Sequence, residues 1–172
     1  MDIMEVIKTR CSVRSYQERP VEEEKLKSIL EAARLAPSAS NRQEWRFVVV
    51  RDKEKRQHLM KAARNQVFVG EAPIIIACCA ETDNHLMGCG QLSYPIDVAI
   101  AIEHMVLKAA EEELGTCWIG AFHEEQVKDI LDIPEDIRIV ELLALGYPAK
   151  PCPKHKDRLP LEEIVMYEKW KR

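Results

Sequence analysis

Arg10, Ser12 and Arg14 alternate along the stretch RCSVRSYQERP near the N-terminus. In an extended segment these three side chains share one face, and Cys11 and Val13 lie on the other. Two guanidinium groups and a hydroxyl suit the oxygens of a phosphate group, because arginine presents its donors as a rigid fork. The pattern is compatible with a phosphate site, but taken by itself it favours an exposed basic turn.

Two further polar stretches could contribute to such a site. Lys156 and Arg158 repeat the basic alternation in KHKDRLPLEEIV, where the plain alternative is an exposed basic loop. The stretch APSASNRQEW at residues 36–45 combines short polar side chains with free backbone donors in a turn. Taken by itself, that stretch is a loop that stops a helix.

Composition limits the classes of protein that this chain can be. Its 172 residues predict a single domain, 1–172, and the 47% hydrophobic and 31% charged residues are typical of a globular protein. A net charge of −4 gives no general attraction to nucleic acid, so an anion site must be local. No apolar run is long enough to span a bilayer, and MDIMEVIKTR lacks the features of a signal peptide. We therefore expect a cytoplasmic protein.

The sequence contains six cysteines: Cys11, Cys78, Cys79, Cys89, Cys117 and Cys152. Without an export signal, free thiols are the expected state. The alternative is a metal site near Cys78, Cys79, His85 and Cys89, but their spacing matches no common zinc pattern. We therefore expect no metal, and cysteines that pack as small apolar side chains.

Periodicity and turn residues predict the elements that must position these groups. We expect helices over 2–9, between Pro20 and Pro37, and over 53–64, 95–115 and 124–131, with another in the tail LEEIVMYEKW. Apolar and β-branched runs predict strands over 45–52, 73–80, 116–122 and 137–148. Asp52 is a candidate N-cap and Gly115 a candidate C-cap. The long helix is apolar almost all round in its first half, which predicts burial or an interface.

Glycine motifs that bind phosphate through the backbone do not follow any of these strands. Neither GxGxxG nor GxxxxGK[ST] occurs there. A bound phosphate must therefore be held by side chains. The loop over 81–95 is longer than most connections, and such loops are often functional.

Four pieces of the chain, in order, resemble the nitroreductase family. They are RCSVRSY, the helix that runs into APSASNRQEW, the stretch IDVAIAIEHMVLKAAEEELGTCWIGAF, and GYP followed by KDRLPLEEIV. The resemblance covers nearly the whole chain. It implies an α+β fold, with a central mixed, mostly antiparallel sheet flanked by helices, and an intertwined homodimer with FMN at the interface.

The resemblance also implies which residues contact the FMN phosphate. Arg10, Ser12 and Arg14 match the N-terminal element that holds the phosphate and part of the flavin. Lys156 and Arg158 match the basic pair that closes on the same phosphate.

Other matching positions concern the flavin ring. By resemblance, one loop reaches the flavin of the other subunit through Pro37, Ser38, Ala39 and Asn41. The ring itself is contacted by Asn65 at its pyrimidine edge and, beside its N5, by the backbone of Ile119, Gly120 and Ala121. Arg14 and Asn65 are candidates for favouring the reduced flavin. For Gly120, a role in packing is an equally plain explanation.

Three positions depart from the family pattern and leave the substrate open. Cys11 stands where a basic residue is common, Ala39 replaces a frequent serine, and Glu44 stands where proline is frequent before Trp45. The loop over 81–95 lies where the substrate-covering region varies in the family.

The implied function is an FMN-dependent oxidoreductase that passes electrons from NAD(P)H to a small nitroaromatic or quinone acceptor by a ping-pong mechanism. The flavin performs the chemistry, so no catalytic side chain is assigned, and His104 is expected to be a core or interface residue. The alternatives are a specialised relative, either a reductive dehalogenase or a flavin-cleaving enzyme, and a flavin-binding redox sensor without turnover.

Overall fold

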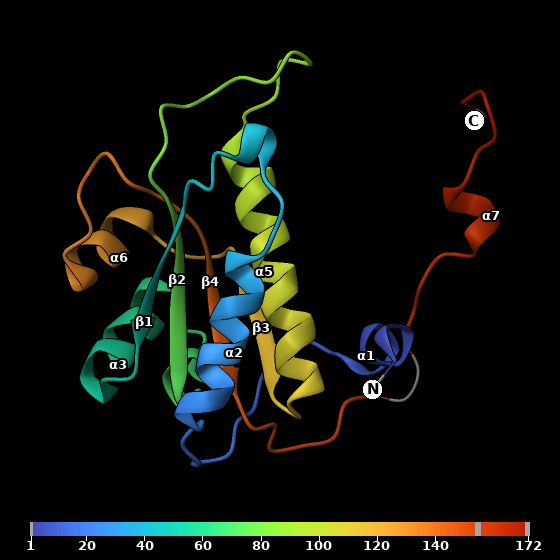
Figure 1. The fold of residues 1–172 in the computed structure, drawn as a ribbon. Coiled ribbons are helices and arrows are strands. Elements are labelled where there is room, and N and C mark those ends of the chain that lie inside the picture. The colour runs from blue at the N-terminus through green and yellow to red at the C-terminus, as the bar shows by residue number, and fades with distance from the viewer. Residues whose placement is uncertain (1, 154–155, 171–172) are drawn as a thin grey trace.

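The computed structural model describes residues 2–153 and 156–170. Its elements are shown in Figure 1 and follow in the order α1 (Ile3–Thr9), α2 (Glu23–Arg34), the short 3₁₀ helix η1 (Ala39–Asn41), β1 (Trp45–Val50), α3 (Lys53–Ala62), α4 (Val67–Glu71), β2 (Ile74–Ala80), α5 (Ser93–Glu111), β3 (Gly115–Ile119), α6 (Glu124–Leu131), β4 (Arg138–Gly146) and α7 (Leu161–Ile164).

The four strands form one sheet in the order β1-β2-β4-β3, and all three neighbouring pairs are antiparallel. Parallel pairing among the described residues is confined to an isolated bridge between Ser12 and Thr116. The predicted α+β fold, with helices flanking a mostly antiparallel sheet, is confirmed. Because β3 is an edge strand, part of its backbone can hydrogen-bond a ligand or another segment.

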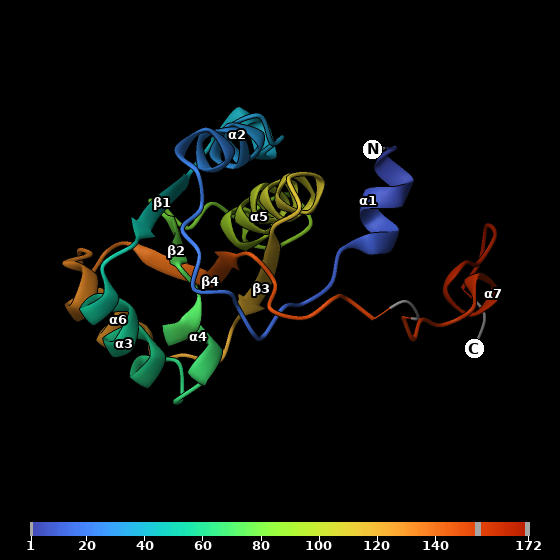
Figure 2. The same cartoon turned by 90° about the horizontal axis from the view of Figure 1, so that it is seen from below.

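Helices cover both faces of the sheet (Figure 2). On one face, α2 and α5 pack against β-strand side chains such as Leu143 and Leu145. On the other face lie α3, α4 and α6, where Leu59 of α3 and Leu142 of β4 belong to a second buried cluster. The central strand β2 is buried along its whole length, which explains its unbroken apolar sequence.

The longest helix, α5, differs at its end from the prediction. It ends at Glu111, and the N–H of Glu112 bonds to carbonyls of the last turn, so the predicted C-cap at Gly115 is wrong. Gly115 instead begins β3, where a Cβ atom would collide with Val13. No described helix has both the length and the hydropathy needed to cross a membrane.

Other local predictions had mixed outcomes. Asp52 caps α3 as expected, because its carboxylate accepts a hydrogen bond from the Lys55 N–H at 2.8 Å. His104 is a packing residue as expected: its Nδ1 lies 3.1 Å from the Ala32 carbonyl of α2. The sequence did not predict α4, because five residues are too few to show helical periodicity. The predicted tail helix is confined to α7.

The two ends of the described chain lie outside the sheet and its covering helices. Helix α1 stands beyond the β3 edge, and the tail runs past α1 to α7, away from the sheet (Figures 1 and 2). Large apolar side chains on the tail are exposed: Leu159, Leu161, Ile164, Val165, Tyr167 and Trp170.

Candidate functional site

The N-terminal segment lies along the edge of β3. Ser12 pairs with Thr116 in the parallel bridge, and the Val13 N–H donates to the Thr116 carbonyl at 2.8 Å. Val13 is buried, whereas Ser12 and Arg14 are exposed, as the alternating sequence predicted. The missing side chain of Gly115 allows this close approach. The sheet edge thus fixes the position of the first basic stretch.

Basic residues from both ends of the chain meet beside this edge. The Lys156 Nζ donates to the Ile7 carbonyl of α1 at 3.1 Å. Burial, and then the nearby positive charges of Arg10 and Arg158, lower the pKa of Lys156. In the described part of the chain, no carboxylate forms an ion pair with any of these three cations. Such a cluster favours a bound anion.

Arg14 and Arg10 face different neighbours. The charge of Arg14 lowers the pKa of the Cys117 thiol on β3, although burial raises it more. The charge of Arg10 acts on Glu103 of α5, whose pKa burial raises. The structure therefore gathers Arg10, Lys156 and Arg158, and places Arg14 farther along β3, nearer the thiol.

A disulfide joins the two basic stretches and overturns the expectation of free thiols. Cys11 and Cys152 are bonded, with their Cα atoms 5.8 Å apart and a sequence separation of 141. Their approach follows from paired backbone: the Ala149 N–H donates to the Ser15 carbonyl at 2.9 Å, and Tyr16 forms a bridge with Pro148. The other cysteines are free: Cys78, Cys79, Cys89 and Cys117.

The end of β3 and the turn after α3 form a second part of the site. Gly120 and Ala121 are exposed, whereas Ile119 is buried. The Gln66 side chain donates to the Ala121 carbonyl at 3.3 Å, which places the turn carrying Asn65 beside this segment. Asn65 is exposed and has a φ of 58°, a conformation that asparagine tolerates well. The structure thus brings these predicted ring contacts to one edge.

The loop at residues 37–41 lies elsewhere in the same chain. It is held at the start of α5, where the Ala39 N–H donates to Asp97 Oδ1 at 3.0 Å, and Ser38 Oγ accepts from the Gln43 N–H at 3.1 Å. Figure 1 shows this end of α5 far from α1. The structure therefore places Pro37, Ser38, Ala39 and Asn41 at the opposite end of α5 from α1, after which Arg10 follows.

Glu141 is a charged residue near the site that the sequence did not single out. It lies on β4, and a Cβ built on Gly120 would be 3.4 Å from its Oε1. Burial raises the pKa of Glu141 to about 7, although a hydrogen bond with the Ile119 backbone acts in the opposite direction. A single acid within the apolar stretch IRIVELLALGYP was the available signal.

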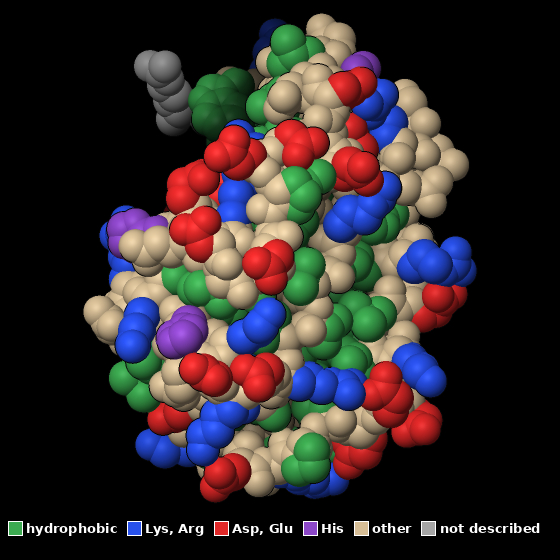
Figure 3. Space-filling model, turned by 90° about the vertical axis from the view of Figure 1, so that its left-hand side faces the viewer, with side chains coloured by type: hydrophobic (Ala, Val, Ile, Leu, Met, Phe, Trp, Pro, Cys, Tyr) green, Lys and Arg blue, Asp and Glu red, His purple; other side chains and the backbone are tan. Residues whose placement is uncertain are grey.

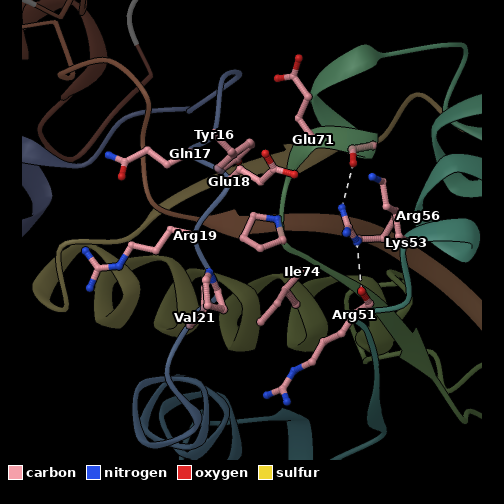
Figure 4. Close-up of a pocket in the computed structure, with 13 residues that line it drawn as sticks. Tyr16, Gln17, Glu18, Arg19, Val21, Arg51, Lys53, Arg56, Glu71 and Ile74 are labelled. Carbon is pink, nitrogen blue, oxygen red and sulfur yellow. Dashed lines mark hydrogen bonds between the residues drawn. The ribbon is translucent and has the colours of Figure 1, made fainter.

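A separate cavity of about 620 Å³ lies between the segment at 16–21, α3 and α4 (Figure 4). Its three arginines already have partners: Arg56 donates to the Gly70 carbonyl at 2.8 Å, Arg51 pairs with Glu23, and Arg19 pairs with Glu22. None of the predicted site residues lines this cavity.

Comparison with known proteins gives consistent matches over most of the chain. The model of the nitroreductase family matches residues 7–91 and 92–147. An NADH dehydrogenase of Thermus thermophilus is 34% identical over 190 residues, covering 92% of each chain. The solved structure of a nitroreductase family protein from Clostridium difficile 630 has a TM-score of 0.89 and 35% identity, covering 99% of this chain and 100% of that one. The NADPH:FMN oxidoreductase from Vibrio harveyi, solved with NAD⁺, has a TM-score of 0.91 and 26% identity, covering 100% of this chain and 79% of that one.

Proposed function

Because this chain belongs to the nitroreductase family, we propose that it is an FMN-dependent oxidoreductase that passes electrons from NAD(P)H to a small organic acceptor. One observation carries the proposal: Arg10, Lys156 and Arg158 converge beside the β3 edge with no carboxylate paired to them among the described residues. A phosphate group supplies the missing negative charge and several acceptors.

The residues of this chain would hold FMN at two places. Arg10, Lys156 and Arg158 bind the phosphate, with Ser12 and Arg14 on the adjoining exposed face. The exposed backbone at Gly120 and Ala121 and the amide of Asn65 orient the ring edge. When bound, FMN supplies hydride chemistry, accepting a hydride from NAD(P)H and passing the electrons to the second substrate.

The proposal includes a homodimer with shared sites. The loop at residues 37–41 lies at the end of α5 far from α1, and a second copy can bring the same loop to the phosphate and ring contacts of this chain. A nitroaromatic or quinone acceptor and ping-pong kinetics are also part of the proposal.

We place the reaction in the cytoplasm, where its electron donor is found. Recovery of the protein from another cell fraction would contradict that placement.

The first test is the colour and redox behaviour of the purified protein. We expect a yellow protein that NADH or NADPH bleaches without oxygen, and that a quinone or nitroaromatic compound then reoxidises. Initial rates at several concentrations of both substrates should give parallel double-reciprocal lines. Colourless protein that takes up no FMN would refute the proposal. Bound flavin that neither NADH nor NADPH reduces would instead indicate a redox sensor without turnover.

Riboflavin is the matched control for the phosphate contacts. It has the same ring and lacks the phosphate, and each charge-assisted hydrogen bond contributes about 1.5–3 kcal/mol. We therefore expect riboflavin to bind at least about 100-fold more weakly than FMN, because several such bonds are lost. Equal affinity would remove the basic cluster from the cofactor site.

A further inference from the structure

We propose that the carboxyl group of Glu141 lies behind the backbone that faces the flavin and tunes the reduction potential of the bound flavin through its charge. The inference rests on the proposed function, because it requires FMN beside Gly120. Glu141 would then act on the flavin through its charge, and it needs no direct contact with the substrate.

The geometry places this carboxyl group against the end of β3. Glu141 pairs with Cys78 of β2 in the sheet register, and the next residue, Leu142, pairs with Ile119 of β3. A Cβ atom on Gly120 would lie 3.4 Å from Oε1 and 3.6 Å from Oε2 of Glu141. Because Gly120 has no side chain and is exposed, its backbone lies directly beside the carboxyl group.

The hydrogen bonding of Glu141 is incomplete. Its Oε1 is buried and has no hydrogen-bond partner among the described residues. A buried carboxylate oxygen without a donor is unfavourable, and either protonation or an arriving donor relieves the cost. The residue is therefore suited to take up and release a proton at this position.

Among the titratable groups around it, Glu141 is the one whose pKa lies near neutral pH. The titratable neighbours recorded in the described chain are the thiols of Cys78 on β2 and Cys117 on β3. Burial raises the pKa of both thiols, so they stay neutral at pH 7, and Arg14 only partly offsets this effect at Cys117. Burial also raises the pKa of Glu141, to about 7.

The expected direction follows from charge. Reduction adds negative charge to the flavin, which an ionised Glu141 opposes and a protonated Glu141 does not. As pH rises through about 7, the ionised carboxylate should make the potential more negative. A tenfold loss in preference for the reduced flavin corresponds to about 30 mV for a two-electron couple.

The test is a redox titration of the FMN-loaded protein at pH values on both sides of the pKa of about 7. Glu141→Gln keeps the shape and removes the charge. We expect its potential to match the wild type at low pH and to lie about 30 mV higher at high pH. Glu141→Asp should keep a pH-dependent difference from Glu141→Gln. The control, Glu125→Gln, changes an exposed acid on α6 and should match the wild type throughout.

Two outcomes separate this inference from the proposed function. Failure of the wild type to bind FMN would refute the function and, with it, the inference. Bound, reducible FMN whose potential is the same in the wild type and Glu141→Gln at every pH would overturn the inference alone.

If Glu141→Gln does not fold, carboxyl ¹³C spectra of the wild type decide the point. The Glu resonance that Glu141→Asp removes should titrate near 7 and shift to higher pH on flavin reduction, and an unmoved midpoint would overturn the inference.

Discussion

Arg10 and Arg158 share no local stretch of sequence, yet both act on the same ammonium group of Lys156. The alternation of basic residues in each stretch is visible in the sequence itself. Their convergence followed only from the family resemblance and not from either pattern alone, because it depends on backbone pairing between segments at opposite ends of the chain, such as the bond from Ala149 to Ser15. Glu141 escaped prediction for a similar reason: only the register with β3 places it behind Gly120.

A single substitution tests the role of Arg10. Arg10→Ala removes a charge-assisted contact worth about 1.5–3 kcal/mol, so FMN should bind about tenfold more weakly or worse. Titration of FMN fluorescence with cofactor-free protein measures this affinity. Lys8→Ala is the matched control, because Lys8 is an exposed basic residue in the last turn of α1, which Arg10 caps. Unchanged affinity in Arg10→Ala would exclude Arg10 from the phosphate site.

At the scale of elements, length decided what could be predicted. The strands and the helices of eight or more residues were expected near their observed positions, because their periodicity extends over several turns or pleats. The five-residue α4 was missed, and Gly115 was misassigned because glycine suits both a helix C-cap and a close approach between strands. The close approach to Val13 is a tertiary contact that no local pattern reveals.

The disulfide between Cys11 and Cys152 links two elements that carry the proposed phosphate ligands. Cys11→Ser should lower the free energy of unfolding by about 2–4 kcal/mol, because the cross-link restricts the unfolded chain. It should also weaken FMN binding, since Lys156 is then held less firmly beside Arg10. Urea unfolding and FMN titration of the oxidised protein measure the two effects.

Two controls distinguish the cross-link from a general effect of thiol chemistry. Cys89→Ser changes an exposed free cysteine and should leave both quantities unchanged. Adding a reductant to the wild type should reproduce the Cys11→Ser values and should have no effect on Cys11→Ser itself. A wild type that is equally stable with and without reductant would contradict the prediction.

For the whole molecule, the family resemblance predicted an FMN site that two copies of the chain share. The surface of the single chain indicates which segment the second copy would cover. One face, over α3 and α6, presents acidic and basic side chains intermixed around a smaller apolar area (Figure 3). The tail, in contrast, carries Tyr167 and Trp170, each about four-fifths exposed, on a segment that extends away from the sheet. Exposed apolar side chains gathered on one segment are typical of an interaction site.

The tail therefore provides the most direct test of the homodimer. Removal of residues 160–172 deletes Leu161, Ile164, Tyr167 and Trp170, whose exposed apolar surface we expect the second copy to cover. Obligate interfaces commonly bury at least about 2,000 Å², so losing this part should reduce dimer formation and FMN retention together. Light scattering after size-exclusion chromatography gives the mass, and absorbance gives the flavin content of the same peak. The double substitution Glu162→Gln and Glu163→Gln, which keeps the apolar side chains, should stay dimeric and yellow. A full-length monomer that retains FMN would refute the shared site, because one chain would then be sufficient to hold the cofactor without the loop of a second copy.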